Sequence, residues 1–170
     1  MAKKIQLLNG VLELPETLLI PWEGIVIHHS LTRDNITLND TEAIRRYHIN
    51  TNGWRDIGYH FLIEQDRPEP GGLPAVIIRP GRHLNEYGAH TLGRNTKDIG
   101  ICIVGNFDTA EPDKELTRAA VELCGNLLCE IPTLNLRLIK PHSFYAPYKT
   151  CPGHLLDWTN FILDIQAGQT

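Results

Sequence analysis

The chain has 170 residues, of which 42% are hydrophobic and 21% charged, and its formal net charge is −4 at pH 7. These values are ordinary for a globular domain and argue against disorder, collagen and coiled coil, and the length predicts one domain over 1–170. Because the chain is mildly acidic and has no basic cluster, we expect no nucleic-acid partner. No apolar run approaches the ~18 residues that a membrane helix needs, so we also expect no membrane partner.

The start of the chain does not resemble a secretion signal. Lys3 and Lys4 provide a basic beginning, but polar residues interrupt the apolar run that would have to follow. We therefore expect the protein to be cytoplasmic in the cell that makes it. The next segment, residues 11–20, is ambiguous between helix and strand.

Strand-like and helix-like segments then alternate. Runs rich in β-branched and apolar residues predict strands at 24–29, 59–63, 75–78, 99–104 and 136–139. Turn residues between the second and third of these runs make them a hairpin. The interleaving with helices predicts an α/β domain with one central mixed β-sheet flanked by helices.

Three helices are expected. The first is capped by Asn39, with Glu42 three residues later as a capping box. Its inner stripe is predicted to be Ile44, Tyr47, His48 and Thr51. Helical spacing also predicts helices at about 116–131 and 157–165. Residues 80–98 form a long predicted surface loop, and ordered loops of this length are often functional.

The chain contains four cysteines: Cys102, Cys124, Cys129 and Cys151. Disulfides are the less expected use in a chain without a secretion signal. Cys124 and Cys129 lie five residues apart on one predicted helix, too far to be bridged. We interpret these two and Cys102 as small buried apolar residues. Cys151 differs, because it lies in a loop with no apolar pattern to bury it.

Two histidines and Cys151 suggest a metal site. His28 and His29 end the first strand, and only one of them can face a given site, because side chains alternate along a strand. His142 follows the last short strand, and Cys151 lies nine residues later. Two imidazoles and one thiolate match a catalytic zinc site, which keeps its fourth position open. The alternative interpretation is that each is a satisfied buried group.

Five segments, in order along the chain, carry a family resemblance. They are residues 26–30, 53–61, 88–91, 95–101 and 142–152. They resemble the zinc-dependent N-acetylmuramoyl-L-alanine amidases, the family of phage T7-type lysozyme and the peptidoglycan recognition proteins. The resemblance extends from about residue 24 to 158. Two departures are a one-residue insertion between His142 and Cys151 and a stretch at 64–82 that is richer in Pro and Gly.

The resemblance implies roles for individual residues. The Zn²⁺ ligands would be His28, His142 and Cys151, at strand ends in a surface groove, with His29 facing away from the metal. Tyr59 and Lys149 would be catalytic, with the Lys149 ammonium stabilising the oxyanion. The substrate groove would include His90, Asn95, Trp54 and His48, the last two being also plausible core residues.

The implied function is hydrolysis of the amide bond between N-acetylmuramic acid and L-alanine in bacterial peptidoglycan. We expect a monomeric phage or prophage endolysin that acts on the cell wall after release. One alternative is a cytosolic muropeptide-recycling amidase, although such relatives usually carry Asp where Cys151 stands. Others are a non-catalytic peptidoglycan-binding module, which typically lacks the third ligand, and a structural zinc domain, which would need a fourth.

Overall fold

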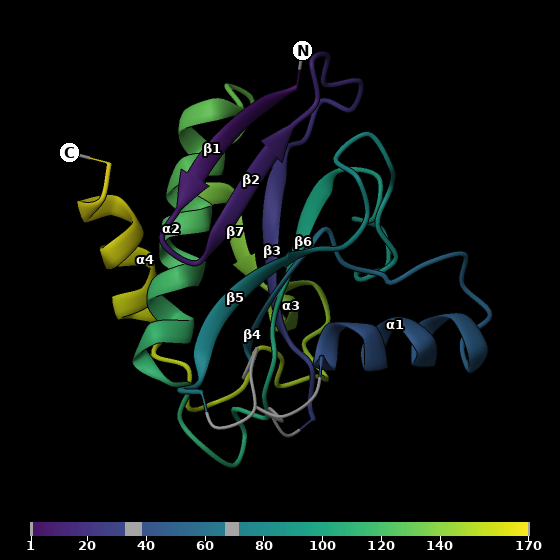
Figure 1. Ribbon diagram of the computed structural model, residues 1–170, viewed down its shortest axis with the longest axis vertical. Helices are drawn as coiled ribbons and strands as arrows, with labels where there is room; N and C mark the ends of the chain where they lie inside the picture. The colour runs from purple at the N-terminus through teal and green to yellow at the C-terminus, as the bar shows by residue number, and fades with distance from the viewer. Residues whose placement is uncertain (1, 33–38, 67–71, 170) are drawn as a thin grey trace.

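The computed structural model describes residues 2–32, 39–66 and 72–169. Within these residues, five strands form a mixed sheet through the middle of the molecule, in the order β5-β4-β6-β3-β7 (Figure 1). The strands are β3 (Gly24–His29), β4 (Phe61–Asp66), β5 (Ala75–Pro80), β6 (Asp98–Ile103) and β7 (Ile139–Pro141). β3, β4, β6 and β7 run parallel to one another, and β5 pairs antiparallel with β4 as the predicted hairpin. The prediction of an α/β domain with a central mixed sheet is confirmed.

A second, two-stranded sheet was not predicted. β1 (Lys3–Leu7) and β2 (Gly10–Leu14) form an antiparallel hairpin. The hairpin is attached to β5, because the Asn9 carbonyl oxygen accepts a hydrogen bond of 2.7 Å from the Ile78 N–H. The Asn9-Gly10 dipeptide is a turn signal that could have revealed this hairpin.

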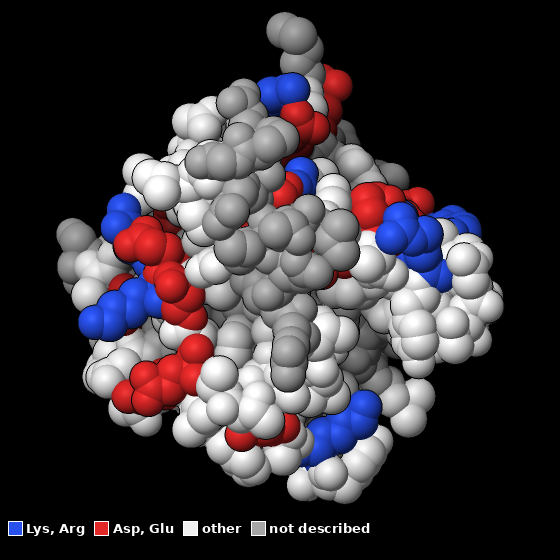
Figure 2. Space-filling view, turned by 60° about the horizontal axis from the view of Figure 1, so that its bottom comes forward, with Lys and Arg blue, Asp and Glu red and all other residues white. Residues whose placement is uncertain are grey.

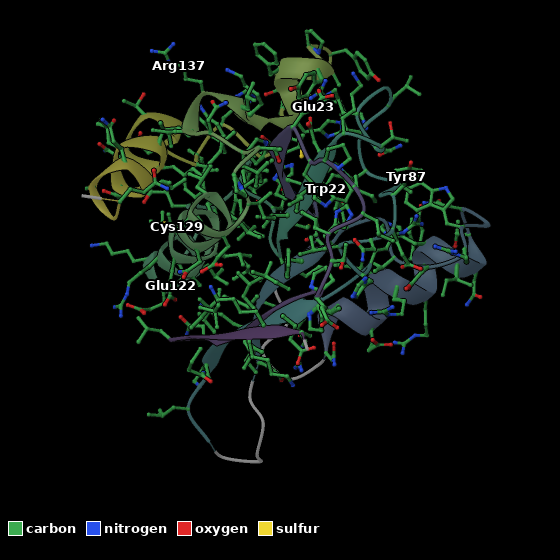
Figure 3. All side chains as sticks on the ribbon, turned by 90° about the horizontal axis from the view of Figure 1, so that it is seen from above. Trp22, Glu23, Tyr87, Glu122, Cys129 and Arg137 are labelled. Carbon is green, nitrogen blue, oxygen red and sulfur yellow. The ribbon has the colours of Figure 1, made fainter. Side chains whose placement is uncertain are left out.

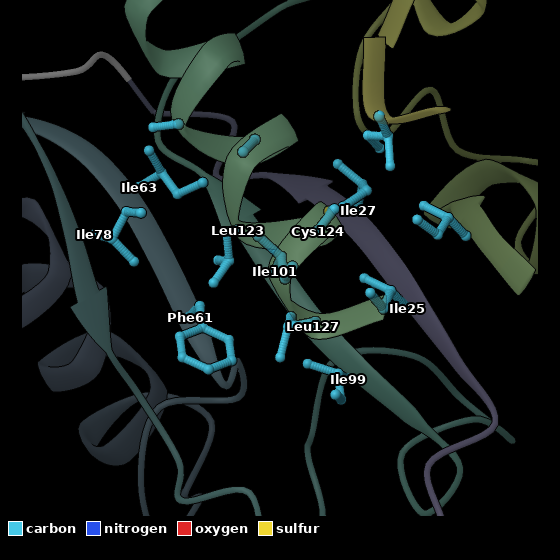
Figure 4. Close-up of a cluster of buried hydrophobic side chains, with 14 of the residues drawn as sticks. Ile25, Ile27, Phe61, Ile63, Ile78, Ile99, Ile101, Leu123, Cys124 and Leu127 are labelled. Carbon is cyan, nitrogen blue, oxygen red and sulfur yellow. The ribbon is translucent and has the colours of Figure 1, made fainter. Parts of the chain in front are cut away.

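One face of the sheet is packed against α2 (Lys114–Glu130), with α4 (Trp158–Ala167) outside it (Figure 1). We call this the covered face. Its sheet residues are almost all isoleucine, and Figure 4 shows them meeting α2; the labelled side chains are Ile25, Ile27, Phe61, Ile63, Ile78, Ile99, Ile101, Leu123, Cys124 and Leu127. The alternation that buries these residues turns the residues between them to the opposite face.

The opposite face of the sheet is called the site face. It carries His28, Leu62 and Cys102, which lie side by side in the parallel register. A small apolar cluster of Ile57, Leu62, Cys102 and Val104 covers part of it. Loops and α1 (Asp40–Asn50) lie against the remainder, with Thr41 donating to Glu64 and His48 accepting from the Gly58 N–H.

The helices agree with prediction in place but not in every detail. The Asp113 side chain accepts a hydrogen bond from the Glu115 N–H at the start of α2, and Asn39 accepts one from the Glu42 N–H at the start of α1. In α1, however, Tyr47 is 58% exposed and Thr51 is also exposed, so half of the predicted inner stripe was wrong. The helix projects beside β4 (Figure 1), and its buried residues are only Asp40, Thr41 and His48.

Two further predictions need correction. Cys129 is exposed rather than buried, because five residues of helix turn it about 140° away from Cys124. The predicted strand at 136–139 is instead a 3₁₀ turn, Leu136–Leu138, closed by the Leu138 N–H donating to Asn135 O, followed by β7. A short helix that was not predicted, α3 (His142–Tyr145), follows β7 directly.

The predicted surface loop is confirmed: residues 81–97, all described, contain no helix or strand. Trp22 anchors it from the interior, because its Nε1–H donates to the Leu84 carbonyl oxygen at 2.9 Å. Figure 3 shows Trp22 towards the middle of the molecule and Tyr87, a residue of this loop, farther out. The described helices include none with the length and apolar character of a membrane span. On the face shown in Figure 2, acidic and basic side chains lie interspersed.

Candidate active site

Three potential metal ligands converge beside the carboxyl ends of the parallel strands. The ligand atoms of His28, His142 and Cys151 all lie within 4.8 Å of one another, and all three residues are buried. His28 is the penultimate residue of β3, and His142 follows the neighbouring strand β7 directly. Parallel pairing of these two strands therefore brings the imidazoles to the same edge of the sheet.

Backbone hydrogen bonds hold Cys151 against the histidines. The Ser143 N–H donates to the Cys151 carbonyl oxygen at 2.8 Å, and the His29 N–H donates to Cys151 Sγ at 3.4 Å. Cys151 is only 6% exposed, although no apolar pattern in the sequence predicted its burial. Its position follows from these bonds and from the loop around it.

A carboxylate clamps this loop from outside. Asp108 accepts hydrogen bonds from the Thr150 hydroxyl at 2.6 Å and from the His154 N–H at 3.1 Å. The Leu155 N–H donates to Phe107 O on the same clamping segment. These bonds fix the end of the loop that carries Cys151, whose ligand atom lies within 4.8 Å of that of His142.

His29 is turned to the other side of its strand. Its Nδ1 accepts a hydrogen bond of 3.2 Å from the Phe107 N–H, and its ring lies 6.0 Å from the Phe107 ring. His29 does not belong to the group of three ligand atoms. This is the orientation that the alternation along β3 predicts.

Burial sets the protonation of the three groups. Burial, together with the nearby Lys149 charge, lowers the pKa of His142 to about 4, and burial lowers that of His28 well below its usual 6.5. Neutral imidazole is the form that binds a metal. Burial raises the pKa of Cys151 to about 12, so a metal cation would be needed to hold it as the thiolate.

The donor set fits a zinc ion. Cys151 Sγ lies 3.7 Å from His28 Nδ1, close to the roughly 3.6 Å expected between a sulfur and a nitrogen bound to one tetrahedral zinc. Among the described residues, no fourth His, Cys, Asp or Glu joins the group. Three protein ligands with an open position are the pattern of a catalytic rather than a structural zinc site.

The group lies in the wall of a groove of about 800 Å³. Eight of the nine predicted ligands, catalytic residues and substrate residues line this groove: His28, Trp54, Tyr59, His90, Asn95, His142, Lys149 and Cys151. His48 lies behind this wall, where its Nδ1 accepts from the Gly58 N–H and its ring packs 4.6 Å from Trp54. Its placement is that of a supporting residue.

Tyr59 and Lys149 flank the ligands. The Tyr59 ring lies 5.1 Å from the His28 ring, and burial raises the pKa of Tyr59 well above 10, so its hydroxyl remains protonated. Lys149 is exposed, and its backbone N–H donates to the Ala146 carbonyl oxygen. The site thus combines a phenol that keeps its hydrogen with a positive charge.

His90 and Asn95 are heavily engaged within the protein. Asn95 Oδ1 accepts hydrogen bonds of 2.7 Å from the N–H groups of both His90 and Thr91. His90 contacts His28 through Nδ1 and the Asp98 carbonyl oxygen through Nε2. Burial lowers the pKa of His90 to about 3, so its ring is neutral.

The sequence analysis assigned no role to Thr91 or Asp98, although both are buried. The Thr91 hydroxyl lies 3.3 Å from His28 Nε2, and the Asp98 carbonyl oxygen lies 3.1 Å from His90 Nε2. Asp98 begins β6 and accepts two hydrogen bonds from Arg94, at 2.6 and 2.7 Å. The i, i+4 spacing of this pair directly before a strand was the available signal. Thr91 offered no signal beyond its place next to His90.

Comparisons with known proteins agree with the geometry. Residues 19–154 match the family described as N-acetylmuramoyl-L-alanine amidase. The endolysin of Klebsiella phage KP32 is 31% identical over 131 residues, which cover 76% of this chain and 79% of that protein. The amidase LysC from Clostridium intestinale has a TM-score of 0.71 at 25% identity, with 89% of this chain and 90% of that chain covered.

A relative from an animal has been solved with a ligand. A point variant of Drosophila PGRP-LB, in complex with tracheal cytotoxin, has a TM-score of 0.67 at 26% identity and covers 84% of this chain and 85% of its own. Tracheal cytotoxin is a monomeric diaminopimelic acid-type peptidoglycan. With the family match extending over most of its length, and with a His-His-Cys group at the sheet edge, this chain belongs to the N-acetylmuramoyl-L-alanine amidase family that includes phage endolysins and peptidoglycan recognition proteins.

Proposed function

We propose that the protein is a zinc-dependent N-acetylmuramoyl-L-alanine amidase that releases stem peptides from bacterial peptidoglycan, as an endolysin does. The observation that carries this proposal is the three-donor group of His28, His142 and Cys151, which leaves a coordination position open in the wall of a groove. A structural zinc site would have no use for the open position. Such an endolysin would be a monomer, made in the cytoplasm and active on the wall after release.

The three donors would hold the zinc ion, and the groove would hold the substrate amide. When bound, zinc supplies a nucleophile by lowering the pKa of water to about 7, and it polarises a carbonyl group. Burial lowers the pKa of His28 and His142, so both imidazoles are neutral near pH 7 and protons do not compete with the metal for their nitrogens.

Lys149 would stabilise the charge that develops on the substrate, and Tyr59 or Lys149 would supply a proton to the leaving group. Negative charge develops on the carbonyl oxygen during attack, and the Lys149 ammonium in the groove wall can stabilise it. The departing amine needs a proton. The Tyr59 hydroxyl, which keeps its hydrogen, and the Lys149 ammonium are the two groups beside the ligands that can provide it.

A second candidate function is peptidoglycan binding without hydrolysis. It is favoured by the relative that was solved in complex with tracheal cytotoxin. The presence of all three donors favours the enzyme. A muropeptide-recycling amidase remains a variant of the enzyme proposal and would prefer soluble fragments to intact wall.

Mass spectrometry of purified peptidoglycan after incubation with the protein tests these proposals. An amidase releases peptides that begin with L-alanine; a chelator stops the release and added Zn²⁺ restores it. Protein that contains zinc and sediments with cell wall, yet releases no peptide, would be a binding module. Comparing intact sacculi with soluble muropeptides at equal concentration separates the endolysin from the recycling enzyme.

A further inference from the structure

His90 contacts the ligand His28 directly. His28 Nε2 and His90 Nδ1 are 3.0 Å apart, and the two rings meet edge to face with centroids 5.1 Å apart. The other nitrogen of His90, Nε2, lies 3.1 Å from the Asp98 carbonyl oxygen. Both ring nitrogens of His90 are therefore engaged inside the protein.

This geometry determines which nitrogen of each ring carries hydrogen. A carbonyl oxygen only accepts, so His90 must donate from Nε2 to Asp98 and accept at Nδ1. His28 must then donate from Nε2, which leaves the lone pair of His28 on Nδ1. That atom is the one 3.7 Å from Cys151 Sγ, on the side where the other ligands lie.

Thr91 and Asn95 complete the arrangement. The Thr91 hydroxyl lies 2.9 Å from His90 Nδ1 and 3.3 Å from His28 Nε2, so it can bridge the two rings. Asn95 holds the backbone of both loop residues through its Oδ1. Thr91 is only 2% exposed, so water does not compete for these bonds.

Two glycines leave room for the His90 ring. A Cβ atom built on Gly88 or on Gly100 would lie 2.5 Å from His90 Cδ2. Any side chain at either position would displace the ring from both of its partners. The ring is thus held between the loop and β6 in one orientation.

We propose that His90 is a positioning residue for the metal site, which fixes the tautomer and orientation of His28, rather than a substrate contact. The inference rests on the proposed zinc site. Partners of this kind orient ligand histidines in metalloproteins, and their loss typically weakens metal binding about 10–100-fold.

A pair of substitutions separates the two ring nitrogens. His90→Asn places a carbonyl oxygen where Nδ1 lay and can still accept from His28, whereas His90→Gln places its amide near Nε2 and reaches only Asp98. Both are made together with Thr91→Val, so that the Thr91 hydroxyl cannot replace the lost acceptor. Zinc affinity is measured by competition with a chromophoric chelator, and thermal unfolding of the metal-free proteins checks folding.

We expect the Asn variant to stay within about threefold of Thr91→Val alone and the Gln variant to bind zinc about 10–100-fold more weakly. Equal zinc affinities for the two variants, together with a raised KM for peptidoglycan in both, would overturn the inference and make His90 a substrate contact.

A second measurement requires neither zinc nor activity. In the metal-free protein, ¹⁵N chemical shifts of the His28 ring report which nitrogen carries hydrogen. We expect Nε2 in the wild type and a mixture in the Gln variant; hydrogen on Nδ1 in the wild type would contradict the inference. If the protein shows the expected His28 tautomer and its variants show the expected ranking of zinc affinities, but it releases no peptide, the proposed function is refuted and this inference is not.

Discussion

The two faces of the central sheet are built in different ways. On the covered face, isoleucines of β3 and β6 pack against leucines of α2, and almost any well-packed apolar side chain could take their places. On the site face, the same strands present His28, Gly100 and Cys102, each with a particular neighbour. Glu64, also on this face and fully buried, accepts hydrogen bonds from Thr41 and Arg79.

This difference suggests a division of labour. The covered face provides most of the apolar burial, whose free energy scales with area and depends little on direction. The site face keeps polar groups out of water and must satisfy each one, because an unpaired buried polar group costs about 1–3 kcal/mol. Stability should therefore respond most to changes on the covered face, and function to changes on the site face.

The largest effect should come from Cys151→Ala. Zinc would lose its only anionic protein ligand, so we expect peptide release to fall to the background and bound zinc to be lost. Metal analysis and the peptidoglycan assay measure both, with circular dichroism confirming that the fold persists. Near wild-type turnover would remove Cys151 from the site.

Ile101→Ala tests the covered face. The side chain is fully buried among isoleucines and leucines, and its truncation should lower the free energy of unfolding by about 2–5 kcal/mol. Urea unfolding measures the loss. Zinc affinity of the folded protein should change little. A large loss of zinc affinity in protein that is still folded would break the division between the faces.

Lys149→Ala should reduce rate without loss of metal. If the ammonium acts like an oxyanion-hole donor, kcat should fall by about 10²–10³-fold, or about 2.7–4 kcal/mol. Lys140→Ala is the matched control, because Lys140 lies over the Phe144 ring and is not part of the groove wall. Unchanged kcat in the Lys149 variant would make this lysine an ordinary surface charge.

Lowering the pH should reduce the stability of the metal-free protein through the buried histidines of the site face. Burial lowers the pKa of His60 and His142 to about 4 and of His90 to about 3, from an ordinary value of 6.5. The unfolded chain therefore takes up protons between pH 6.5 and 4 that the folded chain does not. Stability of the metal-free protein should be greatest above pH 6.5 and fall as the pH is lowered, by about 1.4 kcal/mol per pH unit for each such proton.

Urea unfolding in a chelator at several pH values checks this expectation. His60→Gln, which removes one of the buried imidazoles, should make the slope shallower. A flat profile between pH 6.5 and 4.5 would show that these histidines already carry protons in the folded protein.

The same contrast explains what the sequence could predict. The strands of the covered face are recognisable from their β-branched residues, and α2 is recognisable from its helical spacing. The positions of these strands and of α2 were predicted correctly. The convergence of His28, His142 and Cys151 was predicted mainly through the family resemblance, because spacing alone cannot tell a ligand from a buried histidine. The bonds of His90 depend on the path of the loop at 81–97, for which the sequence carries no periodic signal.

The N-terminal hairpin was not predicted, and the inner stripe of α1 was predicted only in part, for a related reason. Each contributes only a narrow buried strip to the molecule, so its apolar pattern is weak. In α1, exposed Tyr47 lies one residue from buried His48, and polarity alone ranks them in the wrong order. Edge elements take their burial from their neighbours, which the local sequence does not describe.

The smallest effect should come from two cysteines on one helix. Cys124 is fully buried on the covered face, and burial raises the pKa of its thiol, whereas Cys129 is exposed. Cys129→Ala should change the free energy of unfolding by no more than about 0.5 kcal/mol. Cys124→Ala should cost more, because it leaves unfilled space against the isoleucines.

Reaction of the native protein with a thiol reagent provides a second measure of the same pair. Cys129 should be modified quickly and Cys124 only on unfolding, because the thiolate is the reactive form and burial disfavours it. Cys129→Ala should therefore abolish the fast phase, while Cys124→Ala should leave it intact. A fast phase that survives in Cys129→Ala but disappears when Cys124 is also replaced would mean that the covered face opens more readily than its packing implies.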